Sequence, residues 1–361
     1  MKKLLLILAL FASLSLDAQF VTTFAKNATD IQSDGILYYL PRNVIRLELT
    51  IEETEYVIGP YAEFASKLLG INDYIKENKS ESKIKNIDIQ TFSKIDPNAV
   101  YYISQDDKGK DPLPNVIMDT DGLMLAFGYD NIPAEYKNIR NSFINNNLEP
   151  NERIEASFIE ILDNEVEIDD DDDDDDEEGG NKPKKITKED KAKVAIEKIA
   201  TIRNAYYELM SGSQEVAYGE TTKYMAENLK NLENEYISLF KGKAVTHTYN
   251  KVFYVEPEDN QSSATLSIAK ISGETLKIQF ESNNSLENIA KMSDEVRNSA
   301  QISKLFYRIP TNSNVKILFG SNVIAEKSLT ISQFGYIKAI SVKNNKIIFN
   351  PNTGQIISLT K

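Results

Sequence analysis

A run of ten consecutive acidic residues, 169–178, limits what this chain can fold into more than any other feature of the sequence. Adjacent carboxylates repel one another, and the run offers no apolar side chain that a core could bury. Gly179 and Gly180 follow it directly, and a lysine-rich stretch comes next. We therefore expect residues 166–186 to form an acidic, disordered linker with folded structure on either side.

The same run explains most of the net charge of the chain. Lysine and arginine number 41 against 55 aspartate and glutamate, which gives a formal net charge of −14. Because the run supplies ten of the negative charges, the remaining sequence is only mildly acidic. The chain has no basic surface signal beyond the lysines that follow the run, so we expect neither nucleic acid nor an anionic membrane as a partner.

The residue inventory excludes several chemistries. The sequence has no cysteine, no tryptophan and one histidine, His247. Thiolate nucleophiles, disulfides, cysteine-based zinc sites and iron–sulfur clusters are therefore impossible. The sequence also lacks a Gly-x-Ser-x-Gly elbow and a phosphate-cradling glycine loop, and an alternating strand pattern surrounds His247. We expect no catalytic residues and no cofactor.

Calcium is the one metal ion for which the sequence leaves binding possible. Carboxylates such as Asp169, Asp170 and Asp171 could bind it with low affinity, although the ordered spacing of a calcium loop is absent. Asp119 and Asp121, in the segment Asp-Thr-Asp-Gly, resemble the beginning of such a loop, but its further ligands do not follow. A structural turn is the favoured interpretation of this segment.

Residues 1–18 have the pattern of a secretory signal peptide. Lys2 and Lys3 precede an apolar stretch, residues 4–16, that is too short to span a bilayer, and Ala18 supplies a small residue at the expected cleavage site. We expect export to the periplasm or the extracellular space, without a membrane span. A lipid anchor is excluded because it requires cysteine.

Hydrophobic periodicity predicts an α+β fold with helices and strands in separate blocks. The predicted domains are an α+β domain at residues 19–165, a helical hairpin at 187–242 and a mostly β, sandwich-like domain at 243–361. The predicted strands are residues 35–40, 44–57, 84–92, 100–104, 116–118, 123–127, 246–255, 264–269, 275–280, 304–309 and 315–319.

Helix signals are clearest after the acidic run. Thr187 and Asp190 form a capping-box pattern, and apolar residues then recur at helical spacing as far as Gly212. A second amphipathic helix is predicted at residues 222–240, so the two should pack antiparallel. A short helix should also begin after Gly59-Pro60, and a helical turn is expected within 285–299.

Tyrosines provide the candidate contact surface. In the doublets Tyr38-Tyr39 and Tyr101-Tyr102, a strand would direct one ring to each face, so that one of the two is exposed if the other is in the core. The alternative is that both faces are covered. A protein is a more plausible partner than a glycan, because sugar-stacking sites often use tryptophan.

Seven segments occur in an order that resembles the Bacteroidetes domain of unknown function family 4831. They are GILYYLPRNVIRLELTIEET, GPYAEFASKLLGI, TDGLMLAFG, IRNAYYELMSG, LENEYISLFKG, LFYRIP and ISQFGYIKAI. The resemblance implies a secreted or periplasmic protein of uncharacterised role and supplies no catalytic residues. The chain departs from the family in its acidic insert.

Two functions remain open from the sequence. The export signal and the tyrosine content favour a non-catalytic binding or scaffold module of the bacterial cell envelope. The alternative is a carboxylate-dependent hydrolase, for example one acting on glycans, since two carboxylates suffice for that chemistry. The sequence does not identify such a pair.

Overall fold

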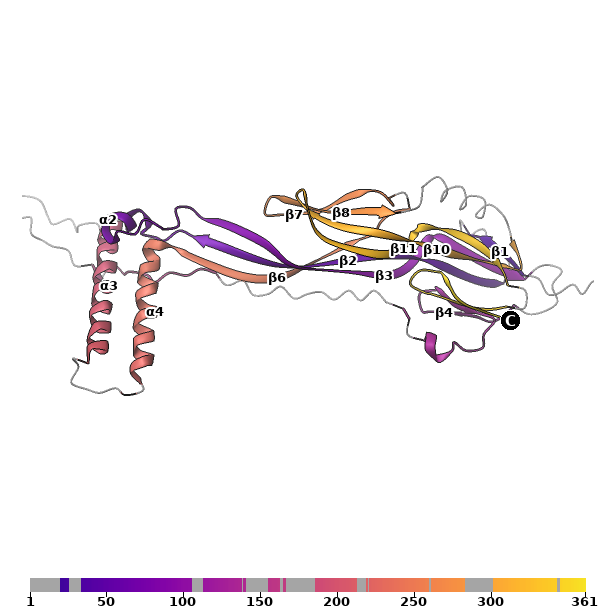
Figure 1. Cartoon of the computed structure of the whole chain (residues 1–361), viewed down its shortest axis with the longest axis horizontal. Helices are drawn as coiled ribbons and strands as arrows, with labels where there is room; N and C mark the ends of the chain where they lie inside the picture. Colours follow the sequence, from indigo (N-terminus) through magenta and orange to yellow (C-terminus); the bar gives the residue numbers. More distant parts are fainter. Residues whose placement is uncertain are drawn as a thin grey trace, which may run out of the picture. The chain divides into compact units, whose positions relative to one another are not determined.

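The computed structural model describes most of the chain, drawn in colour in Figure 1. The described residues are 20–25, 34–105, 113–137, 139–140, 155–162, 165–166, 186–212, 219, 221–259, 261–282, 301–342 and 345–361. The predicted signal peptide, the acidic run and the helical turn expected within 285–299 lie outside these residues.

The fold class is α+β, as predicted, and the chain forms two compact units, each built from separate segments of the sequence. The first compact unit combines Met1–Leu49, Asn86–Leu148 and Asn250–Lys361, and the second combines Thr50–Lys85 and Glu149–Tyr249. The segments of the two units interleave because three long strands extend through both units. Strands β2 (Gly35–Val57), β3 (Lys79–Gln105) and β6 (Lys243–Val255) each supply residues to both units.

Three sheets organise the strands. The first sheet has the order β6-β2-β3-β1-β9, the second β11-β10-β8-β7 and the third β13-β12-β5-β4. The remaining strands are β1 (Phe20–Phe24), β4 (Val116–Met118), β5 (Met124–Phe127), β7 (Thr265–Ile271), β8 (Glu274–Ser282), β9 (Gln301–Ile302), β10 (Lys304–Phe319), β11 (Asn322–Ser341), β12 (Lys346–Phe349) and β13 (Ile356–Thr360).

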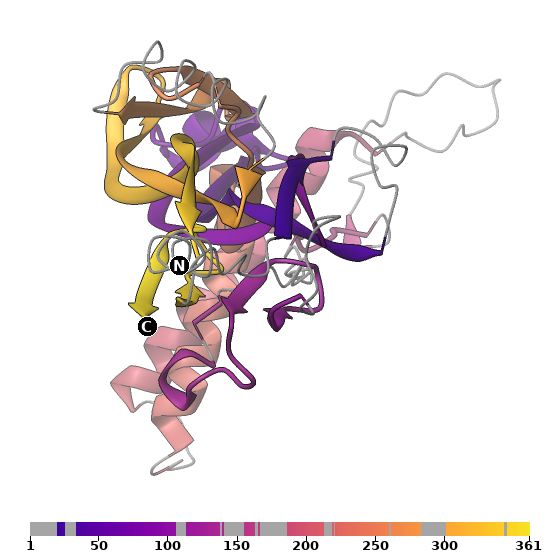
Figure 2. The ribbon, with the colours of Figure 1, turned by 90° about the vertical axis from the view of Figure 1, so that its right-hand side faces the viewer.

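In the first unit the first and second sheets share one hydrophobic core (Figures 1 and 2). The ring of Tyr101, on β3, stacks on that of Phe306, on β10, with centroids 4.4 Å apart. Tyr38, on β2, stacks on the same tyrosine at 5.6 Å. Strand β10 of the second sheet therefore packs against β3 of the first sheet.

Prolines do not interrupt the long strands, contrary to the sequence prediction. Strand β2 continues through Pro41, β3 through Pro97 and β10 through Pro310. Proline fits extended backbone and lacks only the amide donor, so a bulge or an unpaired position accommodates it. At Pro310 the pairing of β10 with β11 shifts register. Residues 332–335 of β11 lie between the paired positions, and at Gly335 a Cβ atom would lie 1.8 Å from the carbonyl oxygen of Ile309.

The second unit contains the helices, which largely confirm the prediction. A 3-10 turn, η2 (Ala62–Phe64), leads into α2 (Ala65–Leu69), and α3 (Lys188–Ser211) and α4 (Thr221–Lys241) form the antiparallel hairpin. Thr187 and Asp190 make both hydrogen bonds of the capping box. In the described part of the chain, no helix has the length and hydrophobicity needed to span a bilayer.

Only one end of the hairpin is packed. Buried Ala192, Ala195 and Ile199 near the start of α3 share a core with Leu239 and Phe240 near the end of α4. Residues of η2 and α2 complete this core. The opposite end of the hairpin has mostly exposed or half-buried side chains.

A buried ion pair joins the first and second sheets within the first unit. The guanidinium of Arg308, on β10, donates to the carboxylate of Asp96, on β3, and their side chains are 3% and 2% exposed. Arg308 also donates to the carbonyl oxygen of Ser332 at 3.2 Å. Arg42 lies 3.9 Å from the same carboxylate.

We expect Asp96→Ala to lower the free energy of unfolding by about 3–5 kcal/mol, because Arg308 then loses the carboxylate that balances its buried charge. Urea unfolding followed by near-ultraviolet circular dichroism measures the change. Glu281→Ala is the control, since Glu281 pairs with Lys316 at the surface of the same unit and such pairs add little stability. Equal losses in the two variants would contradict the prediction.

Candidate functional site

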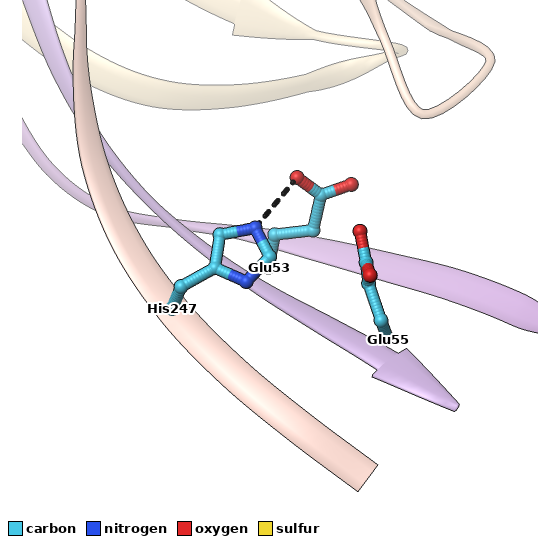
Figure 3. A group of neighbouring side chains, drawn as sticks. All are labelled: Glu53, Glu55 and His247. Atoms are coloured by element: carbon cyan, nitrogen blue, oxygen red, sulfur yellow. Dashed lines mark ion pairs between the residues drawn. The ribbon is translucent and has the colours of Figure 1, made fainter. Parts of the chain in front are cut away.

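Three potential metal ligands meet on one face of the first sheet, within the second unit (Figure 3). Glu53 and Glu55 lie on β2, and His247 lies on the neighbouring strand β6. Side chains alternate between the faces of a strand, so residues two apart share a face. One ligand atom from each of the three residues lies within 4.8 Å of the others.

Both strands beside β2 contact the Glu53 carboxylate. The Nε2 atom of His247 lies 3.3 Å from Oε2 of Glu53, and the two side chains are 12% and 20% exposed. The hydroxyl of Ser80, on β3, donates a hydrogen bond of 2.6 Å to Oε1 of Glu53. The ring of His247 stacks on that of Tyr249, with centroids 6.1 Å apart. These contacts fix the orientation of both groups.

This arrangement allows two kinds of chemistry. One imidazole and two carboxylates form a donor set that suits zinc and related divalent ions. The same groups can also transfer protons as general acids or bases. The hydrolase alternative therefore has two named carboxylates here, Glu53 and Glu55.

The sequence did not single out this cluster. Its only signals are Glu53-Thr54-Glu55 in an alternating strand and a single histidine, His247, in another. Recognising the cluster requires the pairing of β2 with β6, which hydrophobic periodicity does not specify.

The predicted turn at Asp119 has the expected hairpin form, with β4 antiparallel to β5. Oδ1 of Asp119 accepts hydrogen bonds of 2.9 Å from the backbone amides of Asp121 and Leu123. Arg140 binds Oδ2 of Asp119 and Oδ2 of Asp121, each at 2.5 Å. Gly122 takes a positive φ of 92°, which suits glycine. The Asp119 carboxylate therefore binds both the turn and the guanidinium, and the Asp121 carboxylate binds the guanidinium. The other calcium candidates, Asp169, Asp170 and Asp171, lie outside the described residues.

Three of the four candidate contact tyrosines are buried. The side chains of Tyr38, Tyr101 and Tyr102 are 0%, 0% and 4% exposed, because packed structure covers both faces of their strands. The hydroxyl of Tyr38 donates to the carbonyl of Phe306 and accepts from its amide, and burial raises the pKa of this hydroxyl well above its usual value. The half-buried Tyr39 lies against the Asp119 turn. The predicted tyrosine surface thus loses three of its four members.

Comparison with known proteins identifies one family. A family model described as Domain of unknown function (DUF4831) matches residues 34–166 and 184–357. The match confirms the resemblance carried by the order of sequence segments. The matched segments leave out residues 167–183, which contain the acidic run. No curated protein and no solved structure matches the chain.

We expect calcium binding to be independent of the Asp119 turn, because Arg140 already pairs with both of its carboxylates. Calorimetric calcium titrations of the full chain and of an Asp119→Asn/Asp121→Asn variant should give the same isotherm. A calcium-dependent heat that the variant loses would contradict this expectation.

Proposed function

We propose that this chain, which belongs to the family described as Domain of unknown function (DUF4831), is a non-catalytic binding or scaffold protein of the bacterial cell envelope. The observation that carries the proposal is the apolar character of the unpacked end of the helical hairpin. There we place the contact surface for a protein partner.

Large apolar side chains are exposed at this end of the hairpin. Tyr207 and Met210, on α3, are 72% and 58% exposed, and Tyr224, on α4, is 67% exposed. Solvent-exposed apolar side chains that gather in one place mark interaction sites, and tyrosine and methionine are enriched at protein interfaces. We name these three residues the hairpin patch.

A groove beside the hairpin patch provides the shape that a partner side chain could enter. It has a volume of about 660 Å³ and lies between the last turns of α3 and the first turns of α4. Tyr206, Met210 and Ala226 supply apolar lining, Lys223 and Lys230 supply positive charge, and Glu227 supplies a carboxylate 4.0 Å from Lys223. Because the two lysines outnumber the one carboxylate, this lining favours a protein surface with an apolar anchor and acidic surroundings.

The hairpin is anchored in a way that suits presentation of a contact surface. Its other end is fixed by buried Ala195, Ile199, Leu239 and Phe240, and Arg203 pairs with Glu233 between the helices at 2.6 Å. A surface held on packed helices loses little conformational entropy when a partner binds.

We expect a photo-crosslinking residue at position 207 to capture a partner in envelope extract, whereas the same residue at position 359 should not. Leu359 is the control because it is 50% exposed but belongs to β13, a strand of the first unit. With the probe at 207, Met210→Ser/Tyr224→Ser should reduce the yield at least about tenfold, the effect of losing interface anchor residues. Equal capture from both positions, or a yield that the substitutions leave unchanged, would contradict the proposed surface.

Export is a separate expectation, based on the signal-peptide pattern of residues 1–18. The chain recovered from the producing cells should begin at Gln19 and should fractionate with the periplasm or the medium. N-terminal sequencing after fractionation measures both properties. A chain that keeps Met1 in the cytoplasmic fraction would rule out the envelope location without bearing on the hairpin patch.

A further inference from the structure

We propose that Glu53, Glu55 and His247 form a binding site for a divalent transition-metal ion, with zinc as the ion that the three donors suit best. The site lies on the first sheet within the second unit and is independent of the hairpin patch.

The spacing of the first two donors fits tetrahedral coordination. In a tetrahedral site with metal–ligand bonds of about 2.0–2.1 Å, two neighbouring donor atoms lie about 3.3 Å apart. Nε2 of His247 and Oε2 of Glu53 are 3.3 Å apart. The ligand atom of Glu55 lies within 4.8 Å of the other two, and rotation about the side-chain torsions of Glu55 is the adjustment that coordination would use.

The charges of the donors favour a doubly charged ion. Two carboxylates and a neutral imidazole carry a net charge of −2, which a divalent ion balances. An imidazole nitrogen prefers zinc and related ions to magnesium and calcium, which prefer oxygen. Three protein ligands would leave a fourth position for water or another ligand.

The surroundings of the donors also fit a metal site. The hydroxyl of Ser80 holds Oε1 of Glu53 at 2.6 Å and leaves Oε2 directed toward His247. Such outer contacts orient ligating carboxylates in metal sites. The second ring nitrogen of His247, Nδ1, is buried, and no hydrogen bond from a described residue reaches it. A buried polar atom in this state points to an ordered water or an ion nearby.

The sheet holds the donors on regular backbone. Strand β2 lies between β6 and β3, so Glu53 and Glu55 occupy a paired strand, with His247 and Ser80 on its neighbours. On the opposite face, the hydroxyls of Thr54 and Thr246 lie 2.9 Å apart and join β2 to β6. Sites carried by paired strands are more precisely positioned than sites on loops.

The test is a calorimetric zinc titration of the full chain near neutral pH with millimolar magnesium present. Magnesium competes with zinc for the carboxylates of the acidic run, whereas the imidazole retains its preference for zinc. We expect one zinc ion per chain at micromolar affinity. His247→Ala and Glu55→Gln should each weaken binding at least about tenfold, and Ser80→Ala about tenfold.

Glu52→Gln is the matched control. Glu52 is adjacent to Glu53 on β2, but its carboxylate faces the other side of the sheet, where it pairs with Lys85 at 3.3 Å. This variant should bind zinc as the unmodified chain does. Equal weakening by Glu52→Gln and Glu55→Gln, or unchanged binding in His247→Ala, would overturn the proposal.

A second measurement requires no variant, because His247 is the only histidine. In isotope-labelled protein, the ring nitrogen resonances should shift and saturate with one equivalent of zinc. Zinc binding that leaves these resonances unmoved, or no zinc binding at all, would overturn the proposal. Neither result depends on the crosslinking outcome at the hairpin patch.

Discussion

The buried pair of Asp96 and Arg308 is the interaction on which the first unit depends. A charge buried between two sheets is tolerated only beside its partner, so β3 and β10 must meet in one arrangement. Hydrogen bonds between Asn43 and Gln333 also constrain this arrangement. The side-chain amide of Gln333 accepts a hydrogen bond of 2.9 Å from the backbone N–H of Asn43 and donates one of 2.8 Å to its backbone carbonyl. Burial of the aromatic side chains stabilises the packing of the two sheets. The polar contacts specify how the sheets are aligned.

Much of the fold could be predicted because its signals are local. The capping box at Thr187 and the Asp119 turn each depend on a few neighbouring residues, and the structure confirms both. The strand boundaries at Pro41 and Pro310 were wrong because proline weakens a strand only where its missing amide is needed. Whether a bulge removes that need depends on the paired strand, which lies elsewhere in the sequence.

The candidate site could not be predicted for the same physical reason. The hydroxyls of Thr54 and Thr246, which mark the pairing of β2 with β6, are separated by 192 residues. Alternation along each strand places Glu53 with Glu55 and leaves the partner strand undetermined. The tyrosine doublets show a related limit. Both rings of Tyr101-Tyr102 are buried, and Tyr101 stacks on Phe306, which lies in another sheet and far along the sequence. Alternation along a strand predicts the face of the sheet on which a side chain lies. The residues that it contacts there depend on which strands and sheets pack together.

The division into interleaved units has a consequence for the order in which the chain can be completed during synthesis. The second unit ends at Tyr249, so all of its residues are available before β10 and β11 have been made. The first unit must wait for them, because the Tyr38 hydroxyl bonds to Phe306, 268 positions later. Until then the N-terminal strands expose the surface that becomes the core. Contacts of such long range fold slowly, and strands that wait for distant partners are exposed to aggregation.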